Sequence, residues 1–366
     1  MRRQFSEAGH PELVRLRRLT AQVGADPLLT QASTGNSSMK LDGVLWIKAS
    51  GNWMADALDE DILIPLPLER VIRDCYEHGI DPAGQYPGAS IETAMHAVLL
   101  THRVVLHLHS VNTIAWAVQK NAPIQLQQRL DGLNWQWVPY VASGLPLASA
   151  LENALFAAPD TDIFVLGNHG LVIGGEDCST VRNLLVEVEQ RLSIRPRRAH
   201  PADYAALDRL CQTSSWWELP DDDDIHALGT DAMSQAILSG GLLYPCQAIF
   251  CNSSTPDLFK PIPAPDPWDD CLSQYSNRPF LIVAGLGVLV SRRITTVELA
   301  MIGGLAQIIQ RVDAASSPLR YLAEVEFATA CAGRYRELAN GRVRSGRRIR
   351  AEPDLGVANL KPRKLG

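Results

Sequence analysis

Two histidines one residue apart, His107 and His109, are the residues of this chain best suited to chemistry. They follow the apolar run Val104 to Leu106, whose β-branched residues predict a buried strand. Side chains on a strand alternate between its two faces, so both imidazoles are expected on one face at the end of the strand. Such a pair can ligate one divalent metal ion, although an isolated pair could equally be histidines that bond to backbone or water.

Two other side chains are expected near this pair. His169 lies in the tight connection 167–170 (Gly-Asn-His-Gly) after a predicted apolar strand, so it is well placed to face a cleft. Three histidines at neighbouring strand ends would form a metal site that leaves a coordination position for substrate. Glu92 lies on the first turn of a predicted helix that Ser90 would cap. Its carboxylate would ligate the metal, act as general base once substrate displaces it, or only complement the helix dipole.

Segments rich in glycine and serine fit an anionic ligand. Residues 34–38 (Thr-Gly-Asn-Ser-Ser) and 49–51 (Ala-Ser-Gly) offer backbone N–H groups, hydroxyls and an amide. Ser90 adds a hydroxyl at a predicted helix N-terminus, where the dipole favours an anion. The chain has no Walker A sequence and no convincing GxGxxG fingerprint, so a nucleotide cofactor is not expected.

Hydrophobic periodicity predicts the elements that must position these residues. Besides the strand that begins at Val104, we expect helices over 10–24, 91–100, 111–118 and 178–192, strands over 43–48, 162–166 and 171–173, and a loop over 31–38.

After residue 192 the chain contains a linker, an acidic run and a basic C-terminal segment. A linker at 195–201 contains two prolines and breaks the helix pattern. Four adjacent aspartates, Asp221 to Asp224, are more typical of a solvated loop or a helix N-terminus than of a metal site. The basic segment 341–366 has little apolar content and is expected to be a flexible tail.

A faint internal repeat links the two halves of the chain. Residues 280–299 echo residues 163–181 as strand, glycine turn, strand and helix. Leu286 stands at the position of His169, and no HxH pair occurs in the second half. The second half is therefore expected to keep the fold and lack the metal ligands, unless the similarity is chance.

Composition narrows the class of protein. The chain has 366 residues, enough for one large domain or two ordinary ones, with 46% hydrophobic and 20% charged residues. Its net charge of −6 argues against a nucleic-acid partner, and no apolar run approaches the roughly 20 residues that span a membrane. Seven scattered cysteines without a CxxC pair predict reduced thiols, a cytoplasmic protein, and a metal held by nitrogen and oxygen.

Five motifs in order resemble the class II aldolase/adducin family, over about residues 10 to 195. They are Gly35-Asn36-Ser37-Ser38, Lys48-Ala49-Ser50-Gly51, Ser90-Ile91-Glu92 with His96, His107-Leu108-His109-Ser110 and Asn168-His169-Gly170-Leu171. Residues 45–51, 138–140 and the long C-terminal half look most like the aldolase portion of bifunctional rhamnulose-phosphate aldolase/alcohol dehydrogenases. Their dehydrogenase portion has no counterpart in this chain.

The resemblance implies an α/β fold, with a mixed, largely antiparallel sheet between two helical layers. It implies that His107, His109 and His169 bind zinc or another divalent metal, that Glu92 is the catalytic acid/base, and that a substrate-phosphate cradle is formed by Gly35, Asn36, Ser50, Gly51 and Ser90. The expected domains are a catalytic domain at 1–200, a degenerate aldolase-like domain without the ligands at 201–340, and the tail.

By this resemblance the protein would be a zinc-dependent aldolase that cleaves a ketose phosphate or related sugar through a metal-stabilised enediolate. An alternative uses the same site for epimerisation, dehydration or decarboxylation, although the family's 4-epimerases carry Asp where this chain has Glu92. A non-catalytic, adducin-like binding protein is a third alternative. The chain departs from the family at Ile91, which replaces a serine. The family's catalytic tyrosine has no obvious counterpart between Ala122 and Val138, and the nearby Tyr140 falls in a different motif. The expected partner is a small sugar, and a homo-oligomer is allowed.

Overall fold

A seven-stranded sheet forms the centre of the N-terminal half in the computed structural model, which describes residues 10–250, 256–264 and 272–332. Its strand order is β3-β2-β1-β4-β7-β6-β5, and every neighbouring pair is antiparallel except β5 and β6. The mixed, largely antiparallel sheet is thus confirmed. The strands are β1 (Asn36–Leu41), β2 (Val44–Lys48), β3 (Leu63–Pro67), β4 (Val104–Leu108), β5 (Trp135–Val138), β6 (Ile163–Leu166) and β7 (Gly170–Gly175).

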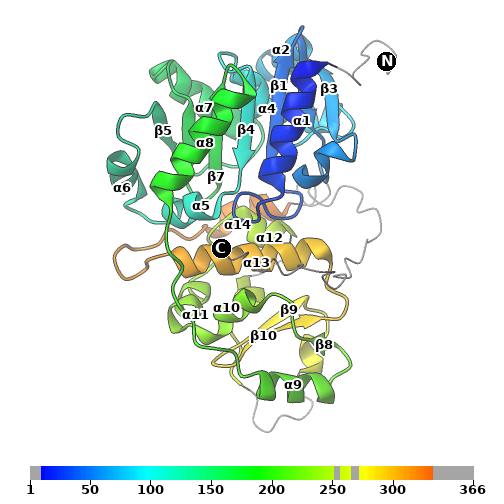
Figure 1. Cartoon of the computed structure of the whole chain (residues 1–366), viewed down its shortest axis with the longest axis vertical. Helices are drawn as coiled ribbons and strands as arrows, with labels where there is room; N and C mark the ends of the chain where they lie inside the picture. The colour runs from blue at the N-terminus through cyan, green and yellow to red at the C-terminus, as the bar shows by residue number, and fades with distance from the viewer. Residues whose placement is uncertain (1–9, 251–255, 265–271, 333–366) are drawn as a thin grey trace, which may run out of the picture.

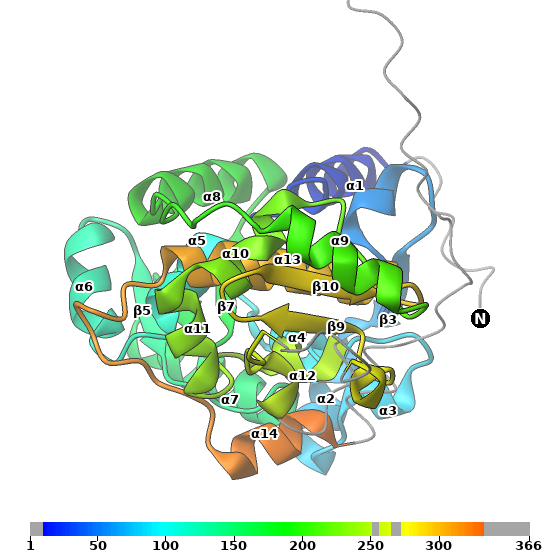
Figure 2. The same cartoon turned by 90° about the horizontal axis from the view of Figure 1, so that it is seen from below.

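Helices cover both faces of this sheet, which gives the expected three layers (Figure 2). One apolar core lies under α1 (Pro11–Gly24) and α8 (Cys178–Leu192), and other cores lie under α2 (Leu68–His78), α4 (Thr93–Val98) and α7 (Leu145–Ala157) on the opposite face. Two helices, α5 (Val111–Ala117) and α6 (Ala122–Arg129), follow the sheet's central strand β4, and the short elements are α3 (Pro82–Gln85) and η1 (Met54–Leu58).

The C-terminal half contains a second, three-stranded antiparallel sheet of order β8-β10-β9. Its strands are β8 (Trp217–Glu218), β9 (Phe280–Val283) and β10 (Gly287–Ser291). Its helices are α9 (Tyr204–Thr213), α10 (Ala227–Thr230), α11 (Ala232–Ser239), α12 (Pro245–Phe250), α13 (Thr296–Arg311) and α14 (Glu324–Cys331), with 3₁₀ turns η2 (Asp223–His226), η3 (Pro256–Phe259) and η4 (Ser273–Tyr275).

The predicted echo of residues 163–181 has the expected local structure. The hairpin of β9 and β10 leads into α13, as the hairpin of β6 and β7 leads into α8. Thr295 and Asp177 cap the two helices at their N-termini. The hairpin and helix are thus alike, but the second sheet has only three strands, so a complete second aldolase-like half remains a prediction.

The acidic run Asp221 to Asp224 leads into a capped turn. The side chain of Asp222 accepts a hydrogen bond from the backbone N–H of Asp224 at the start of η2.

Two elements differ from their predicted extent. The expected loop over 31–38 ends earlier, because β1 begins at Asn36 and pairs with both β2 and β4. The expected helix over 91–100 is shorter, because α4 spans only Thr93–Val98. Beyond it, the carbonyls of Leu99 and His102 accept hydrogen bonds from the Lys40 ammonium instead of continuing the helix. The predicted tail at 341–366 lies outside the described residues.

The two halves share one hydrophobic core. Ile114 of α5 and Val118, just after this helix, pack in the same buried cluster as residues of α11, α12 and α13 (Figure 1). Backbone bonds reinforce this contact, because Arg320 N–H donates to the Val118 carbonyl and Lys120 N–H to that of Pro318. Within the described residues, no helix has the length and apolar character needed to cross a membrane.

Two adjacent glycines of α13 test this packing. A Cβ on Gly304 would lie 2.4 Å from Cγ of Gln31, whereas one on Gly303 would meet only Asp222 Oδ2 at 3.5 Å. We expect Gly303→Ala to raise the free energy of unfolding by about 0.5–1 kcal/mol, because alanine loses less entropy in a helix. Gly304→Ala should instead lower it by about 1–2 kcal/mol, because Gln31 is buried and must move.

Urea unfolding followed by circular dichroism measures both changes. Gly303→Ala serves as the matched control, since it alters the same helix by the same atom. Equal stabilisation by the two substitutions would contradict the packing of α13 on Gln31.

Candidate metal centre

The strand β4 presents His107 on the sheet face that α4 covers. Val104, Leu106 and Leu108 point into the core under α1 and α8, so Val105 and His107 point the other way. The antiparallel register sets Asn36 directly opposite His107. The His107 Nδ1 atom lies 3.1 Å from the carbonyl oxygen of Leu171. A carbonyl can only accept, so Nδ1 carries the hydrogen and Nε2 turns toward the other polar residues of the site.

Glu92 lies at the N-cap position of α4 rather than in its first turn. The backbone N–H of Glu92 donates to Ser90 Oγ at 3.2 Å, so Ser90 caps the turn before the helix rather than the helix itself. Among the described residues, the Glu92 side chain makes no capping bond to α4. Its Oε2 accepts a hydrogen bond of 2.7 Å from Asn36 Nδ2, which directs Oε1 toward the histidines.

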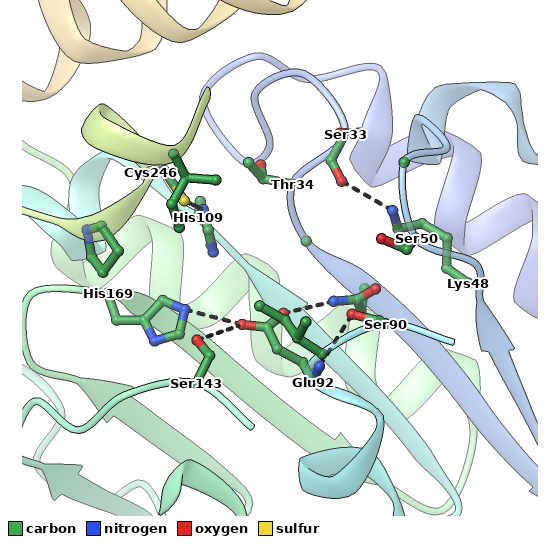
Figure 3. A pocket seen from close by; sticks show the side chains of 16 residues that line it. Ser33, Thr34, Lys48, Ser50, Ser90, Glu92, His109, Ser143, His169 and Cys246 are labelled. Carbon is green, nitrogen blue, oxygen red and sulfur yellow. Dashed lines mark hydrogen bonds and ion pairs between the residues drawn. The ribbon is translucent and has the colours of Figure 1, made fainter. Parts of the chain in front are cut away.

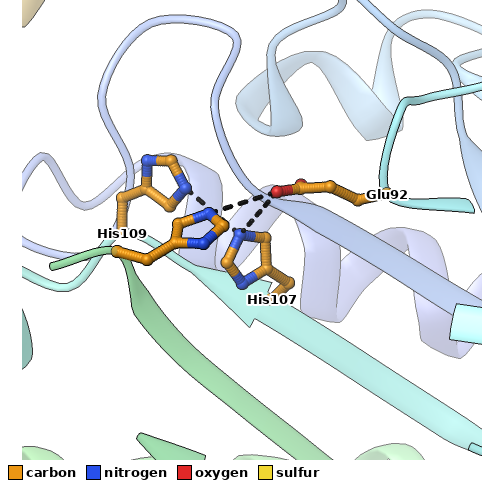
Figure 4. Close-up of side chains that lie close together, drawn as sticks. Glu92, His107 and His109 are labelled. Carbon is orange, nitrogen blue, oxygen red and sulfur yellow. Dashed lines mark hydrogen bonds and ion pairs between the residues drawn. The ribbon is translucent and has the colours of Figure 1, made fainter. Parts of the chain in front are cut away.

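Three imidazoles and one carboxylate meet in the interior. Glu92 Oε1 lies 3.3 Å from His107 Nε2 and 3.2 Å from His169 Nε2, and the Nε2 atoms of His107 and His109 are 3.1 Å apart (Figure 4). One candidate ligand atom from each of the four residues lies within 4.8 Å of the others. Two imidazole lone pairs facing one another so closely require a proton or a cation between them. The donor set and its burial therefore fit one divalent metal ion.

The same residues have strongly shifted protonation equilibria. Burial alone would raise the pKa of the Glu92 carboxyl, but His107 and His169 outweigh it and hold this pKa well below the ordinary value. Burial, with His107 and His169 nearby, lowers the pKa of His109 far below its usual range. Burial also lowers the pKa of His169, although its hydrogen bond to Glu92 opposes the change. The carboxylate is thus ionised, and His109 and His169 are neutral, as metal binding requires.

His169 is held by a constrained turn. The preceding Asn168 has a positive φ of 52°, and its side-chain amide donates to the carbonyls of Leu243 at 2.8 Å and Arg320 at 2.7 Å. The following Gly170 leaves no room for a side chain, since a Cβ there would lie 2.4 Å from the Leu108 carbonyl oxygen. Contacts with the C-terminal half therefore fix the residue next to a candidate ligand.

A cavity of about 70 Å³ opens beside the cluster. Figure 3 shows Lys48, Ser50 and Ser90 on one side and His109, His169 and Cys246 on the other. The structure brings all the predicted site residues together. His107 contacts Glu92 and His109. The other predicted residues line the cavity and are Gly35, Asn36, Ser50, Gly51, Ser90, Glu92, His109 and His169. Gly35 has a φ of 72°, and a Cβ there would lie 2.9 Å from the His107 carbonyl oxygen.

Lys48 lines the cavity, although the sequence analysis names it only within a motif and predicts no role for it at the site. Its side chain is 1% exposed, and its ammonium donates to the carbonyls of Ser33 and Asn52. Burial lowers its pKa to about 8, although the nearby Glu92 carboxylate opposes this. A single lysine that ends the apolar run Val44 to Ile47 was the available signal, because charged residues are rarely buried without a function or a partner.

Four further lining residues also escaped prediction. Ser143 Oγ lies 3.5 Å from Glu92 Oε1. Pro245, Cys246 and Ile249 belong to α12 in the C-terminal half, where no local pattern marks them. Cys246 Sγ lies 3.4 Å from His109 Nδ1, so the second half of the chain reaches the candidate metal centre.

Comparison with known proteins gives a match over the N-terminal half. Residues 14–195 match the family model described as Class II Aldolase and Adducin N-terminal domain. The Bacillus subtilis protein named "Uncharacterized oxidoreductase YuxG" is 28% identical over 199 residues, which cover 47% of this chain and 28% of that protein. This chain therefore spans less than a third of that relative's length.

Two solved structures are similar over the same half. The N-terminal class II aldolase domain of a conserved protein from Thermoplasma acidophilum is 20% identical, with a TM-score of 0.44, covering 52% of this chain and 97% of that one. The L-fuculose-1-phosphate aldolase of Thermus thermophilus is 20% identical, with a TM-score of 0.38, covering 50% of this chain and 92% of that one. Through the domain at residues 14–195, this chain belongs to the class II aldolase and adducin family.

Proposed function

We propose that this protein is a zinc-dependent aldolase that cleaves a ketose phosphate, or a related sugar, by a retro-aldol reaction. The observation that carries the proposal is the convergence of Glu92 Oε1 with the nitrogens of three histidines beside a cavity rich in glycine and serine. This arrangement combines a proton acceptor, a metal site and an anion-binding wall within one small space.

In this proposal His107, His109 and His169 hold the metal. Zinc bound there supplies a Lewis acid that stabilises negative charge on the substrate's oxygens as the carbon–carbon bond breaks. Glu92 is the acid/base. Its ionised carboxylate accepts the proton of the substrate hydroxyl whose carbon leaves as the aldehyde, and Asn36 keeps the carboxylate oriented through its bond to Oε2.

The opposite wall of the cavity binds the substrate's anionic group. Gly35, Asn36, Ser50, Gly51 and Ser90 contribute hydroxyls, an amide and the peptide groups of tight turns. Lys48 adds a buried positive charge to the same wall. A negative group bound there would compensate a charge that is otherwise costly to bury, which supports a phosphorylated sugar over a neutral one.

The metal centre gives the first prediction. We expect purified protein to bind about one divalent ion per chain, because the structure offers one set of converging donors among the described residues. His107→Ala should lose the ion, because His107 is the ligand in contact with both His109 and Glu92. Elemental analysis of the purified proteins measures this.

His78→Ala is the matched control, because His78 is an exposed residue at the end of α2. The control should keep the ion. A metal content that stays the same in His107→Ala would exclude this centre.

The reaction is tested with ketulose 1-phosphates, to which the resemblance of residues 45–51 and 138–140 points first. Wild-type protein should release dihydroxyacetone phosphate in a coupled assay. Glu92→Gln should lower kcat by about 10²–10⁴-fold, because the amide cannot accept the proton, while the metal content stays unchanged. Glu69→Gln, an exposed change in the first turn of α2, should have no effect.

Other products would decide between the alternatives. An epimeric sugar phosphate, loss of water or release of CO₂ would replace the lyase by another reaction at the same site. Metal binding without turnover of any tested sugar would favour a binding protein.

Lys48 predicts a pH dependence of substrate binding. Because its pKa lies near 8, its charge is present below pH 8 and is lost as the pH rises through that value. The KM for a phosphorylated substrate should therefore rise between about pH 7 and pH 9. Lys48→Met should have a raised KM throughout, without the inflection near pH 8. A wild-type pH profile that Lys48→Met leaves unchanged would remove Lys48 from the anion-binding wall.

A further inference from the structure

Helix α12 of the C-terminal half forms part of the metal-site cavity. Its residues Pro245, Cys246 and Ile249 line the same cavity as Glu92 and His169. Figure 3 shows Cys246 next to His109, on the side away from Lys48 and Ser50. Cys246 is 6% exposed, so this contact is enclosed by protein.

His109 needs a hydrogen-bond acceptor at its outer nitrogen. Its Nε2 atom faces His107 Nε2 at 3.1 Å and is the atom available to a metal. A neutral imidazole that offers Nε2 as a lone pair must carry its hydrogen on Nδ1. His107 meets the same requirement by donating from Nδ1 to the Leu171 carbonyl. For His109, the atom beside Nδ1 is Cys246 Sγ at 3.4 Å, within hydrogen-bond range for sulfur.

We propose that Cys246 is a positioning residue, which accepts the hydrogen bond of His109 Nδ1–H and so holds His109 in the orientation and tautomer that binds metal. This inference rests on the proposed metal centre and adds to it a requirement for the C-terminal half. Partners of this kind on metal-binding histidines typically change metal affinity by about 10–100-fold when removed.

The start of α12 is held firmly enough to perform this role. Gln247 Oε1 accepts the backbone N–H groups of Leu243 at 2.6 Å and Tyr244 at 3.1 Å, which fixes the chain just before Cys246. The Leu243 carbonyl accepts a hydrogen bond from the side-chain amide of Asn168, the residue before His169. The segment that carries Cys246 is thus held by hydrogen bonds within residues 243–247 and by one to the turn that carries His169.

The Cys246 sulfur contacts a candidate metal ligand but is not placed to bind the metal itself. The group of ligand atoms that lie within 4.8 Å of one another contains Glu92 and three histidines and does not include Cys246. Its sulfur contacts the nitrogen of His109 that faces away from the group. Cys246 should therefore affect how tightly metal is held without giving the spectrum of a thiolate ligand.

Zinc affinity tests the proposal without an activity assay. Zn²⁺ is titrated into metal-free full-length protein in competition with a chromophoric chelator. Cys246→Ala should raise the zinc Kd by about 10–100-fold. Cys246→Ser should recover part of the loss, since a hydroxyl still accepts a hydrogen bond but reaches less far. Cys178→Ala is the matched control, because this thiol is also buried but lies on α8, and its zinc Kd should equal that of the wild type.

Cobalt substitution separates positioning from ligation. The Co²⁺-loaded wild type should show no thiolate-to-cobalt band in the near ultraviolet, and the visible bands of Cys246→Ala should change in intensity because His109 is less constrained. A thiolate band in the wild type, or an unchanged zinc Kd in a folded Cys246→Ala protein, would overturn the inference. Absence of metal binding by the wild type would overturn the metal centre itself, and the inference with it.

Discussion

The buried charge of Glu92 is the constraint on which this site depends. A carboxylate in the interior carries a desolvation penalty of several kcal/mol unless charged or hydrogen-bonding groups surround it. Here Asn36 donates to one oxygen, and His107 and His169 lie against the other. The pKa of Glu92 falls despite burial because these groups favour its ionised form. A charge balanced in this way stays ionised although protein surrounds it.

The groups that stabilise the Glu92 carboxylate come together because side chains alternate between the two faces of the sheet. Residues directly opposite each other on β1 and β4 share a face, so the pairing of Asn36 with His107 brings an amide and an imidazole together under α4. The next pair on the same face, Ser38 and Val105, shows that this face continues into the core, where Ser38 Oγ lies 2.7 Å from His96 Nδ1. A slip of one residue in this register would turn His107 into the core under α1 and leave Glu92 without its partners.

The parts of the site that could be predicted are those that local periodicity controls. The apolar run before His107 determines the face of β4, and the glycines around His169 determine a turn, so both positions follow from neighbouring residues. The start of α4 did not follow, because Ser90 bonds the N–H of Glu92 and caps a turn instead of the helix. Cys246 could not be found, because it meets His109 only through the packing of elements 137 residues apart in the chain.

The residues of the candidate metal centre depend on contacts with the C-terminal half as well as on the first sheet. The hairpin of β9 and β10 carries Leu286 where the first hairpin carries His169, and Leu286 packs against an apolar cluster. The helix that follows it, α13, meets Gln31 through Gly304. Gln31 in turn donates to the carbonyl of His109 at 3.2 Å, while Cys246 contacts the ring of the same residue. Backbone and side chain of one candidate ligand are thus both held by contacts that begin in the second half. In its described residues, the C-terminal half adds no side chain to the group of Glu92 and three histidines, yet its contacts help to determine the geometry of this candidate metal centre.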